Sequence, residues 1–240
     1  MVGLILAAGK GARLSPGSPG TVIKPLAEAG GSPLISYSFG ILRSLGIKNA
    51  VVVIRRGHEK IADSLGPVYM GTNVRYVVQD EPTGLVSSMA AAKDLIDGDV
   101  LLQLSDEVFL NPTVDARLFE GCDFAVGYTL DSEERIRRNF SVEVSGDGVL
   151  LGCEEKPKHV FNDMKGTGLC YFSKECFDLL QELIDTSGNA PKDLCDFFSL
   201  LISRGKIGRA FLAAEEEINV NTPEELSYAD RRIRESGARL

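Results

Sequence analysis

The sequence predicts an α/β fold, in which a Rossmann-like, mostly parallel sheet is flanked by helices. Short apolar runs alternate with helical patterns through the first half of the 240 residues, as they do in βαβ units. The second half holds short strand-like runs separated by tight turns such as Gly146-Asp147-Gly148, which indicates a partly antiparallel extension of the sheet. No repeat, low-complexity tail or linker interrupts the sequence, so we expect a single domain over residues 1–240.

The first half is expected to form four strands and three helices. Its continuous apolar runs predict buried strands at residues 2–6, 50–54, 74–78 and 99–104. Helical patterns lie between these runs, at residues 33–45, 57–65 and 85–96. For the first helix we expect Ser32 as the N-cap, Pro33 at the first helical position and Gly46 at the C-terminal stop.

The second half is expected to begin with strands and to end with helices. Its short apolar runs predict strands at residues 123–129, 140–145, 149–154 and 167–172. Helices are expected over residues 173–185 and 191–204, followed by a strand over 208–213 and a charged helix that begins near Pro223.

The composition excludes several classes of protein. A net charge of −8 disfavours nucleic acid and anionic membrane surfaces as partners. No run approaches the ~20 apolar residues of a membrane span, and the apolar residues 2–8 lack the basic flank of a signal peptide. The five cysteines are odd in number and contain no CxxC pair, which favours reduced thiols in the cytoplasm over a disulfide framework or a zinc site. A homo-oligomer remains open.

A glycine-rich loop follows the first predicted strand. Gly9 and Gly11 let the backbone turn sharply and bring N–H groups against a polyanion. Arg13 offers a planar fork for phosphate oxygens, and Lys24 adds a compact charge. The Walker pattern GxxxxGK[ST] is absent, and Leu14 stands where a dinucleotide fingerprint requires its third glycine. The sequence therefore predicts a phosphate-binding loop that is neither a Walker loop nor a dinucleotide-binding loop.

This loop resembles the signature of the sugar-1-phosphate nucleotidyltransferase family, LAAGxGxRLxP…KPLxxxxGxPLI. The matching residues are Leu6-Ala7-Ala8-Gly9-Lys10-Gly11-Ala12-Arg13-Leu14, Pro16, Lys24-Pro25-Leu26 and Gly31-Ser32-Pro33-Leu34-Ile35. The resemblance implies that Arg13 holds a triphosphate and that Lys24 contacts the reacting phosphates. It also implies nucleotide contacts from Leu6, Ala7, Ala8, Gly9 and Gly11.

Two later motifs extend the resemblance. Residues 79–90, QDEPTGLVSSMA, are similar to the family's Q-x-x-P-x-G segment, which implies base contacts from Gln79, Pro82 and Gly84. The Gly-Leu pair within this segment looks most like that of the pyrimidine-using members. Asp106 stands just beyond the carboxyl end of a predicted buried strand, where open α/β sheets bind ligands, and its carboxylate can hold Mg²⁺.

The second half resembles the side of the family that binds the acceptor. Glu155 and Lys156 match an E-K-P motif, which implies that the glutamate binds acceptor hydroxyls and the lysine its phosphate. Thr167 and Gly168 lie in a run, GTGLCYF, that resembles the strand lining the acceptor pocket. Phe140-Ser141 aligns with an aromatic-glycine pair of hexose-1-phosphate members, and the serine argues against a standard hexose.

The family's second metal ligand falls in residues 217–226, EINVNTPEEL. The candidates here are Asn219 and Asn221, and a neutral amide binds Mg²⁺ more weakly than a carboxylate. Some members of the family use asparagine. Asn221 could equally cap the helix that begins near Pro223.

The resemblance implies a Mg²⁺-dependent reaction between a nucleoside triphosphate and a phosphorylated acceptor. The acceptor phosphate attacks the α-phosphorus and releases pyrophosphate, with residues 1–110 binding the nucleotide and residues 111–240 the acceptor. Arg13, Lys24, Asp106 and Lys156 are the expected catalytic residues. One alternative is a cytidylyltransferase acting on a phosphocholine, a phosphonate or a polyol phosphate. Another is a non-catalytic regulatory relative, which Ser105 and Asn219 motivate as departures from the family pattern.

Overall fold

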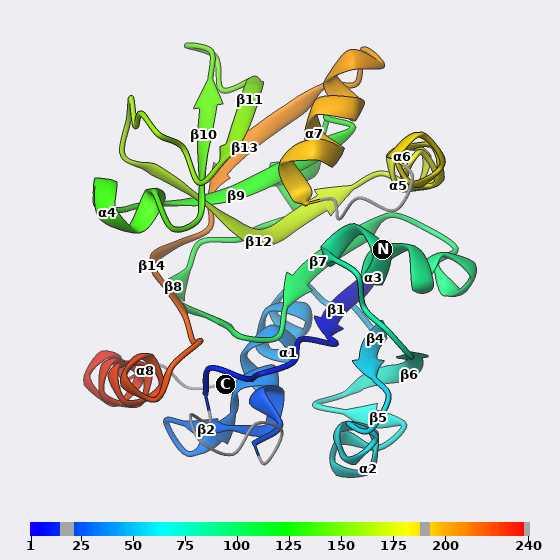
Figure 1. Ribbon diagram of the computed structural model, residues 1–240, viewed down its shortest axis with the longest axis vertical. Coiled ribbons are helices and arrows are strands. Elements are labelled where there is room, and N and C mark those ends of the chain that lie inside the picture. Colours follow the sequence, from blue (N-terminus) through cyan, green and yellow to red (C-terminus); the bar gives the residue numbers. More distant parts are fainter. Residues whose placement is uncertain (15–21, 188–192, 238–240) are drawn as a thin grey trace.

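The computed structural model describes residues 1–14, 22–187 and 193–237. Its main sheet runs in the order β11-β10-β12-β7-β1-β4-β6-β5, with β9 beside β12 and β13 beside β9 (Figure 1). These strands are β1 (Val2–Ala7), β4 (Asn49–Arg55), β5 (Val68–Tyr69), β6 (Thr72–Gln79), β7 (Val100–Leu104), β9 (Phe124–Leu130), β10 (Phe140–Val144), β11 (Leu150–Glu155), β12 (Met164–Phe172) and β13 (Gly208–Leu212). The predicted fold class is confirmed.

The centre of the sheet is parallel and buried on both faces. β1 pairs with β4 on one side and with β7 on the other, and β6 continues the parallel order beyond β4. Along β1, Leu4 and Leu6 enter one hydrophobic core, whereas Ile5 and Ala7 enter the core on the opposite face. Apolar side chains on both faces explain why these strands read as continuous apolar runs.

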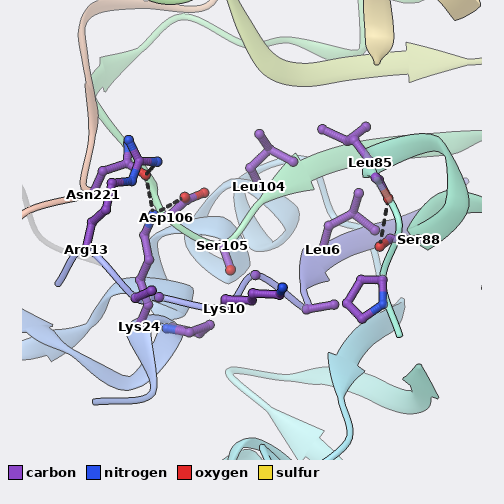
Figure 2. Close-up of a pocket in the computed structure, with 17 residues that line it drawn as sticks. Leu6, Lys10, Arg13, Lys24, Leu85, Ser88, Leu104, Ser105, Asp106 and Asn221 are labelled. Atoms are coloured by element: carbon purple, nitrogen blue, oxygen red, sulfur yellow. Dashed lines mark hydrogen bonds and ion pairs between the residues drawn. The ribbon is translucent and has the colours of Figure 1, made fainter. Parts of the chain in front are cut away.

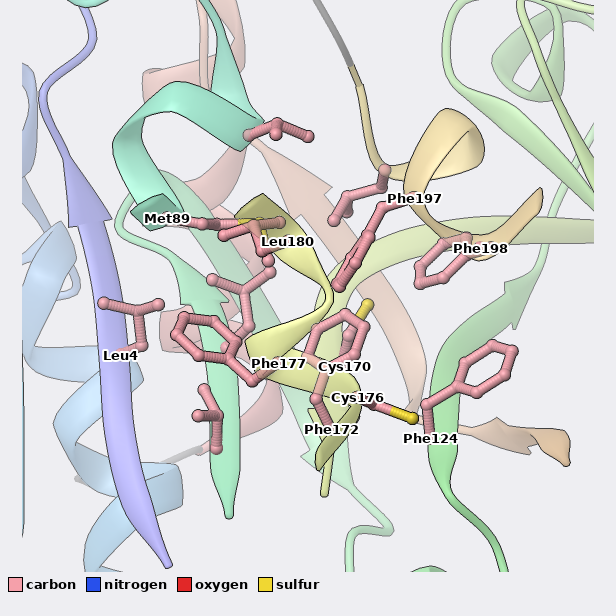
Figure 3. Close-up of a cluster of buried hydrophobic side chains, with 14 of the residues drawn as sticks. Leu4, Met89, Phe124, Cys170, Phe172, Cys176, Phe177, Leu180, Phe197 and Phe198 are labelled. Carbon is pink, nitrogen blue, oxygen red and sulfur yellow. The ribbon is translucent and has the colours of Figure 1, made fainter. Parts of the chain in front are cut away.

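Helices cover both faces of the sheet. One face is covered by α1 (Leu34–Ser44) and α2 (Lys60–Leu65). The other is covered by α3 (Leu85–Ala91), α5 (Lys174–Asp178), α6 (Leu180–Ser187) and α7 (Leu194–Ser203). Figure 3 shows the aromatic centre of this second core, where the rings of Phe172 on β12 and Phe197 on α7 lie 5.2 Å apart. The short helices are η1 (Lys24–Leu26), η2 (Lys93–Leu95), η3 (Ala116–Phe119) and α4 (Glu133–Ile136).

The second half adds the expected antiparallel strands. β12 runs antiparallel to β7, and β10 and β11 continue from it as an antiparallel pair. β12 also pairs with β9, and β13 returns parallel to β9. This part of the sheet lies above the parallel centre in Figure 1, so the two halves of the chain meet along β7 and β12.

Several predicted helix boundaries were wrong. Ser32 does not cap α1, because it pairs with Ala29 in a small hairpin of β2 (Glu28–Ala29) and β3 (Ser32–Pro33). The Gly30-Gly31 turn between them has positive φ at both residues, as a two-residue hairpin requires. The stretch predicted as one helix over 85–96 divides into α3 and η2, and residues 57–59 precede the start of α2.

Two strands that the sequence did not reveal form a separate sheet. β8 (Glu107–Pro112) pairs antiparallel with β14 (Ala214–Asn219), and α8 (Pro223–Ser236) follows directly. The pairing places Asn219 opposite Glu107, and the Val220 N–H donates to the Asp106 carbonyl at 2.9 Å. This small sheet therefore fixes the segment around Asp106 to the segment around Asn219, although the two are far apart in sequence.

A buried ionic cluster joins β14 to the main sheet. Lys165 on β12 is 1% exposed, and its Nζ lies 2.7 Å from both the Asp131 and the Glu217 carboxylates. Arg135 adds a hydrogen bond of 3.1 Å to the Glu217 carbonyl. Nearby, the Glu107 carboxylate accepts the Gly168 N–H at 2.9 Å. Burial, followed by the Glu217 and Asp106 charges, raises the pKa of Glu107 well above its usual range.

Gly166 on β12 supports the ring of Phe140, and it provides a test of the packing between β10 and β12. A Cβ atom at this glycine would lie 1.9 Å from the nearest Phe140 ring carbon. Gly166→Ala is therefore expected to lower the free energy of unfolding by about 1–3 kcal/mol in chemical denaturation. Gly152→Ala on β11 is the matched control, because its added Cβ meets nothing within 4 Å. Equal stability of the two variants would contradict this packing.

Candidate active site

A pocket of about 440 Å³ opens beside the carboxyl ends of β1 and β7 (Figure 2). This is the edge at which open α/β sheets bind ligands. Five segments form its wall. They are the loop after β1, the start of η1, the segment that leads into α3, the turn after β7, and Asn221. The lining residues are Leu6, Ala8, Gly9, Lys10, Gly11, Ala12, Arg13, Lys24, Pro25, Pro82, Gly84, Leu85, Ser88, Leu104, Ser105, Asp106 and Asn221.

The loop after β1 takes the turn that its glycines predicted. Gly11 has φ of +61°, which disfavours any side chain, and a Cβ there would also approach the Lys24 Cβ to 3.3 Å. Leu14 closes the turn by donating its N–H to the Gly11 carbonyl at 3.0 Å. Pro16 of the loop motif lies outside the described residues.

Two cations converge on Asp106 and Asn221 at one end of the pocket. The Lys24 ammonium donates to the Asp106 carboxylate and, at 2.8 Å, to the Asn221 amide oxygen. Arg13 donates to the same amide oxygen at 3.0 Å. Asn221 in turn donates its own amide N–H to Asn219 Oδ1 at 2.6 Å. Three distant parts of the sequence thus meet in one charged cluster: the first 24 residues, Asp106, and the pair Asn219 and Asn221.

Asn221 does not serve as a helix cap. Thr222 occupies that position in α8, where its side chain accepts from the Glu225 N–H and Glu225 closes a reciprocal capping box. The Asn221 side chain is consequently directed at Lys24 and Arg13 instead of the helix end. Both asparagines proposed from the sequence lie at the cluster, although only Asn221 lines the pocket.

The opposite end of the pocket is less polar. Figure 2 shows Leu85 and Ser88 at this end, with Leu6 and Leu104 between them and the charged cluster. Pro82 and Gly84 also line the pocket, as the sequence predicted. The resulting slot is ionic at one end and mixed apolar at the other, a shape suited to a ligand that is anionic at one end only.

Two predicted nucleotide contacts lie off the pocket wall. Ala7 points into the core on the α1 face, because side chains alternate along β1 and its neighbours Leu6 and Ala8 face the pocket side. Gln79 is engaged locally: its amide N–H donates to Ser87 at 2.8 Å and its amide oxygen accepts from Ser88 at 2.7 Å. Ser88, which the sequence reasoning missed, therefore stands between Gln79 and the pocket.

Glu155 is the last residue of β11 and Lys156 follows it, and neither lines the pocket. The Lys156 side chain is 67% exposed and its Nζ lies 2.9 Å from the Glu155 carboxylate. Glu155 raises the pKa of Lys156 by this hydrogen bond and its charge, whereas the Arg13 charge acts to lower it. Lys156 also has φ of +48°, an uncommon conformation for a residue other than glycine. Such strain often marks a functional position.

The other predicted acceptor residues are largely buried. The ring of Phe140 is 7% exposed and packs in the aromatic core over Gly166, so its position argues against direct contact with a ligand. Thr167 is also buried and donates its hydroxyl to the Gly127 carbonyl at 3.0 Å. Gly168 lies against Leu104 and Glu107. Ser141 is half-buried on β10 and is paired with Lys165 in the sheet. None of these four lines the pocket.

The charged cluster has the donor set of a hard divalent cation. Asp106, Asn219 and Asn221 offer oxygen atoms, which Mg²⁺ prefers, and Lys24 already shows that two of these oxygens can converge on one positive charge. No group of three or more His, Cys, Asp or Glu side chains suited to a metal occurs among the described residues. A cation at this cluster would therefore need further oxygen ligands from water or a phosphate.

Fold and pocket together define an α/β protein whose pocket, with Arg13 and Lys24 at one end, lies at the switch point of its sheet. The family model for nucleotidyl transferases matches residues 2–217. The chain therefore belongs to the nucleotidyl transferase family. None of the helices in the described parts of the chain is long and apolar enough to span a membrane.

Several relatives are similar over different parts of the chain. A UTP–glucose-1-phosphate uridylyltransferase of Haloferax volcanii is 29% identical over 98% of this chain and 97% of its own length. A low-salt glycan biosynthesis nucleotidyltransferase of the same organism is 29% identical over 85% of this chain, which spans only 58% of that relative. A CMP-5′-(3-aminopropyl)phosphonate synthase of Streptomyces rubellomurinus is 35% identical over 48% of this chain and 18% of its own length.

Solved structures share the fold. A UDP-glucose pyrophosphorylase superposes with a TM-score of 0.81 at 18% identity, covering 99% of both chains. An inositol-1-phosphate CTP transferase from T. maritima superposes with a TM-score of 0.76 at 17% identity, covering 98% of this chain and 96% of that one. At these identities the likeness concerns the arrangement of the chain alone.

Proposed function

We propose that this protein transfers the nucleotidyl group of a nucleoside triphosphate to a sugar-1-phosphate or similar phosphorylated acceptor and releases pyrophosphate. The observation that carries the proposal is the polarity of the pocket. At one end Lys24 pairs with Asp106, and both Lys24 and Arg13 donate to Asn221. Leu85 and Ser88 lie at the other end. A triphosphate at the first end would place a nucleobase at the second. Family membership supports this assignment.

The chemistry would consist of positioning and charge neutralisation. An acceptor phosphate oxygen attacks the α-phosphorus, the bond to the β-phosphate bridging oxygen breaks, and pyrophosphate leaves with those electrons. The acceptor phosphate is ionised at neutral pH, so no general base is needed. Arg13 and Lys24 neutralise charge on the triphosphate through charge-assisted hydrogen bonds, and backbone N–H groups beside Gly9 and Gly11 bind the same oxygens. Lys156 holds the acceptor phosphate.

We assign the divalent cation to Asp106 and Asn221, with Asn219 behind them. Mg²⁺ bound there would supply charge neutralisation and would position phosphate oxygens for the reaction. A single carboxylate with one or two amides makes a weak site by itself, which fits a cation that arrives with its phosphate ligands. Residues 1–110 would form the nucleotide-binding half of a single domain and residues 111–240 the acceptor-binding half.

Two relatives favour different nucleobases and different phosphorylated acceptors. The Haloferax relative, similar over nearly the full length of both chains, favours a pyrimidine triphosphate and a hexose-1-phosphate. The phosphonate synthase relative, at higher identity over half of this chain, favours the alternative of a cytidylyltransferase acting on a phosphonate or related acceptor. Ser141, where hexose-1-phosphate members carry glycine, favours the same alternative.

A substrate panel separates these possibilities and the non-catalytic reading. CTP, UTP, dTTP, ATP and GTP would each be incubated with Mg²⁺ and a set of acceptors, namely hexose-1-phosphates, phosphocholine, polyol phosphates and alkylphosphonates. Pyrophosphate release that requires both an acceptor and a pyrimidine triphosphate is expected. Absence of release across the panel, together with absence of Mg²⁺-dependent nucleotide binding by calorimetry, would instead identify a regulatory relative.

We also infer a cytoplasmic protein whose partners are small phosphorylated molecules rather than nucleic acid. The five cysteines lie free in the structure, three of them buried. Burial raises the pKa of a thiol and makes it unreactive. The pKa of Cys170, for example, is raised well above its usual range by burial. These features are compatible with a homo-oligomer as well as with a monomer.

Lys156 provides a test of the acceptor side. Lys156→Ala is expected to raise the acceptor KM about tenfold or more, because it removes a charge-assisted contact to the acceptor phosphate. The KM for the triphosphate should change much less, since Lys156 lies outside the pocket. Lys158→Ala, a nearby exposed lysine, is the matched control. Steady-state kinetics with each substrate varied in turn would measure the acceptor KM and the triphosphate KM separately. Equal effects on both KM values would contradict the assignment.

A further inference from the structure

The Lys24 ammonium binds the same oxygen atoms that the proposed function assigns to a divalent cation. Its Nζ donates to the Asp106 carboxylate and, at 2.8 Å, to the Asn221 amide oxygen. Only 10% of the Lys24 side chain and 23% of the Asp106 side chain is exposed, so little water screens the charges. A positive charge of the protein itself thus sits where a metal ion would have to bind.

The surrounding groups hold this arrangement in place. Asn221 donates its amide N–H to Asn219 at 2.6 Å, which directs its amide oxygen at Lys24 and Arg13. The Val220 N–H binds the Asp106 carbonyl, so the two oxygen-bearing segments are tied together by backbone. The aliphatic part of Lys24 lies close to the glycine-rich loop after β1, because a Cβ atom at Gly11 would lie 3.3 Å from the Lys24 Cβ. The ammonium is therefore held by contacts from two segments, those of Asp106 and Asn221, and the base of the side chain lies close to a third, at Gly11.

The charge balance of the cluster opposes a free metal ion. Lys24 and Arg13 carry two positive charges, and Asp106 supplies a single negative charge that contacts Lys24, whereas Arg13 contacts only the neutral Asn221 amide oxygen within the cluster. A divalent cation on the Asp106 and Asn221 oxygens would face both of these positive charges at short range and in a partly buried setting, where repulsion is strong. A triphosphate carries enough negative charge to attract both side chains and the metal together.

We propose that Lys24 is a built-in cation that holds the Asp106 and Asn221 oxygens in position and excludes a divalent cation until a triphosphate draws the ammonium onto its own oxygens. The inference rests on the proposed function. The divalent cation and the triphosphate would then bind together. Lys24, which contacts the Asp106 and Asn221 oxygens before they bind, would afterwards contact the phosphates. Lys24 would thereby prevent free divalent cations from occupying the cluster.

The test measures Mn²⁺ binding in the absence of nucleotide, by equilibrium dialysis with detection of free Mn²⁺ by electron paramagnetic resonance. Lys24→Met keeps the aliphatic stem and removes the charge, and it is expected to bind Mn²⁺ about tenfold or more tightly than the wild type. Lys24→Gln keeps a hydrogen-bond donor for Asp106 and should behave alike, which covers the case that the methionine variant fails to fold. Lys158→Met removes an exposed lysine that does not line the pocket and should bind Mn²⁺ as the wild type does.

Equal Mn²⁺ affinity of the wild type and the folded Lys24 variants, including equal absence of binding, would overturn the inference. A second arm adds an α,β-methylene analogue of CTP or UTP. The wild type should then retain Mn²⁺ with the protein, and Asp106→Asn should lose it. Failure of the wild type to bind Mn²⁺ and analogue together would contradict the proposed function itself, whatever the Lys24 variants do, so the two failures are distinguishable.

Discussion

Replacing Asp106 with alanine is expected to lower turnover about a hundredfold or more while the protein remains folded. The carboxylate is the single acidic side chain that lines the pocket among the described residues. Its loss would remove the charged ligand of the proposed cation and leave Lys24 without its ion-pair partner. Arg13→Ala is expected to cause a loss of the same order, because in the proposed reaction the guanidinium would stabilise charge that develops around the α-phosphate.

Pyrophosphate release with the best substrate pair from the panel measures these effects, and circular dichroism melting checks the fold. Asp106→Asn keeps the shape and a hydrogen-bond acceptor for Lys24, so it separates loss of charge from loss of contact. Asp115→Ala is the control, because Asp115 is half-buried, pairs locally with Arg117 and does not line the pocket. Turnover close to that of the wild type in Asp106→Ala or Arg13→Ala would refute the assigned roles.

Removing the buried ammonium of Lys165 is expected to destabilise the protein by about 3–5 kcal/mol. Lys165→Met would leave the Asp131 and Glu217 carboxylates without their common partner inside the protein. Taking one member from a buried ion pair costs more than the pair contributes, because the remaining charge stays desolvated. Since Glu217 lies on β14, the loss should also loosen the strand that leads to Asn219 and Asn221.

Chemical denaturation of the two proteins gives the difference in free energy. Lys174→Met is the matched control: this lysine pairs with Asp178 on the exposed surface of α5, and such pairs contribute about 0.3–0.5 kcal/mol. If Lys165→Met proved as mild as Lys174→Met, the ionic cluster would not hold β14 in place.

Much of the nucleotide side could be predicted from the sequence because its residues lie close together along the chain. The loop of Gly9, Gly11 and Arg13 follows a continuous apolar strand, and both features are local patterns. Asp106 follows another such strand, and the rule that parallel strands end at one edge was enough to bring it near the loop. The structure confirms that these residues line one pocket; their roles in catalysis remain predictions.

The acceptor side was harder to predict because it depends on long-range packing. β8 begins with the buried Glu107, and β14 carries three consecutive glutamates, of which Glu217 pairs with the buried Lys165. Neither strand therefore shows a simple apolar alternation. Phe140 matched a motif by position, but its ring fills space that Gly166 leaves in the core. Ser88 and Lys10 match no motif that would have predicted a role in binding. They line the pocket because the fold places α3 and the loop after β1 beside it.

The central claim is transfer of the α-phosphorus from a nucleoside triphosphate to a phosphorylated acceptor. It is tested most directly with CTP and UTP labelled at the α-phosphorus, incubated with Mg²⁺, the acceptor panel and pyrophosphatase. Label that appears in a product joining the nucleotide to the acceptor, in amounts matching the pyrophosphate released, is the predicted result. Label that stays in the triphosphate, or appears only in free nucleoside monophosphate whether or not an acceptor is present, would contradict the claim.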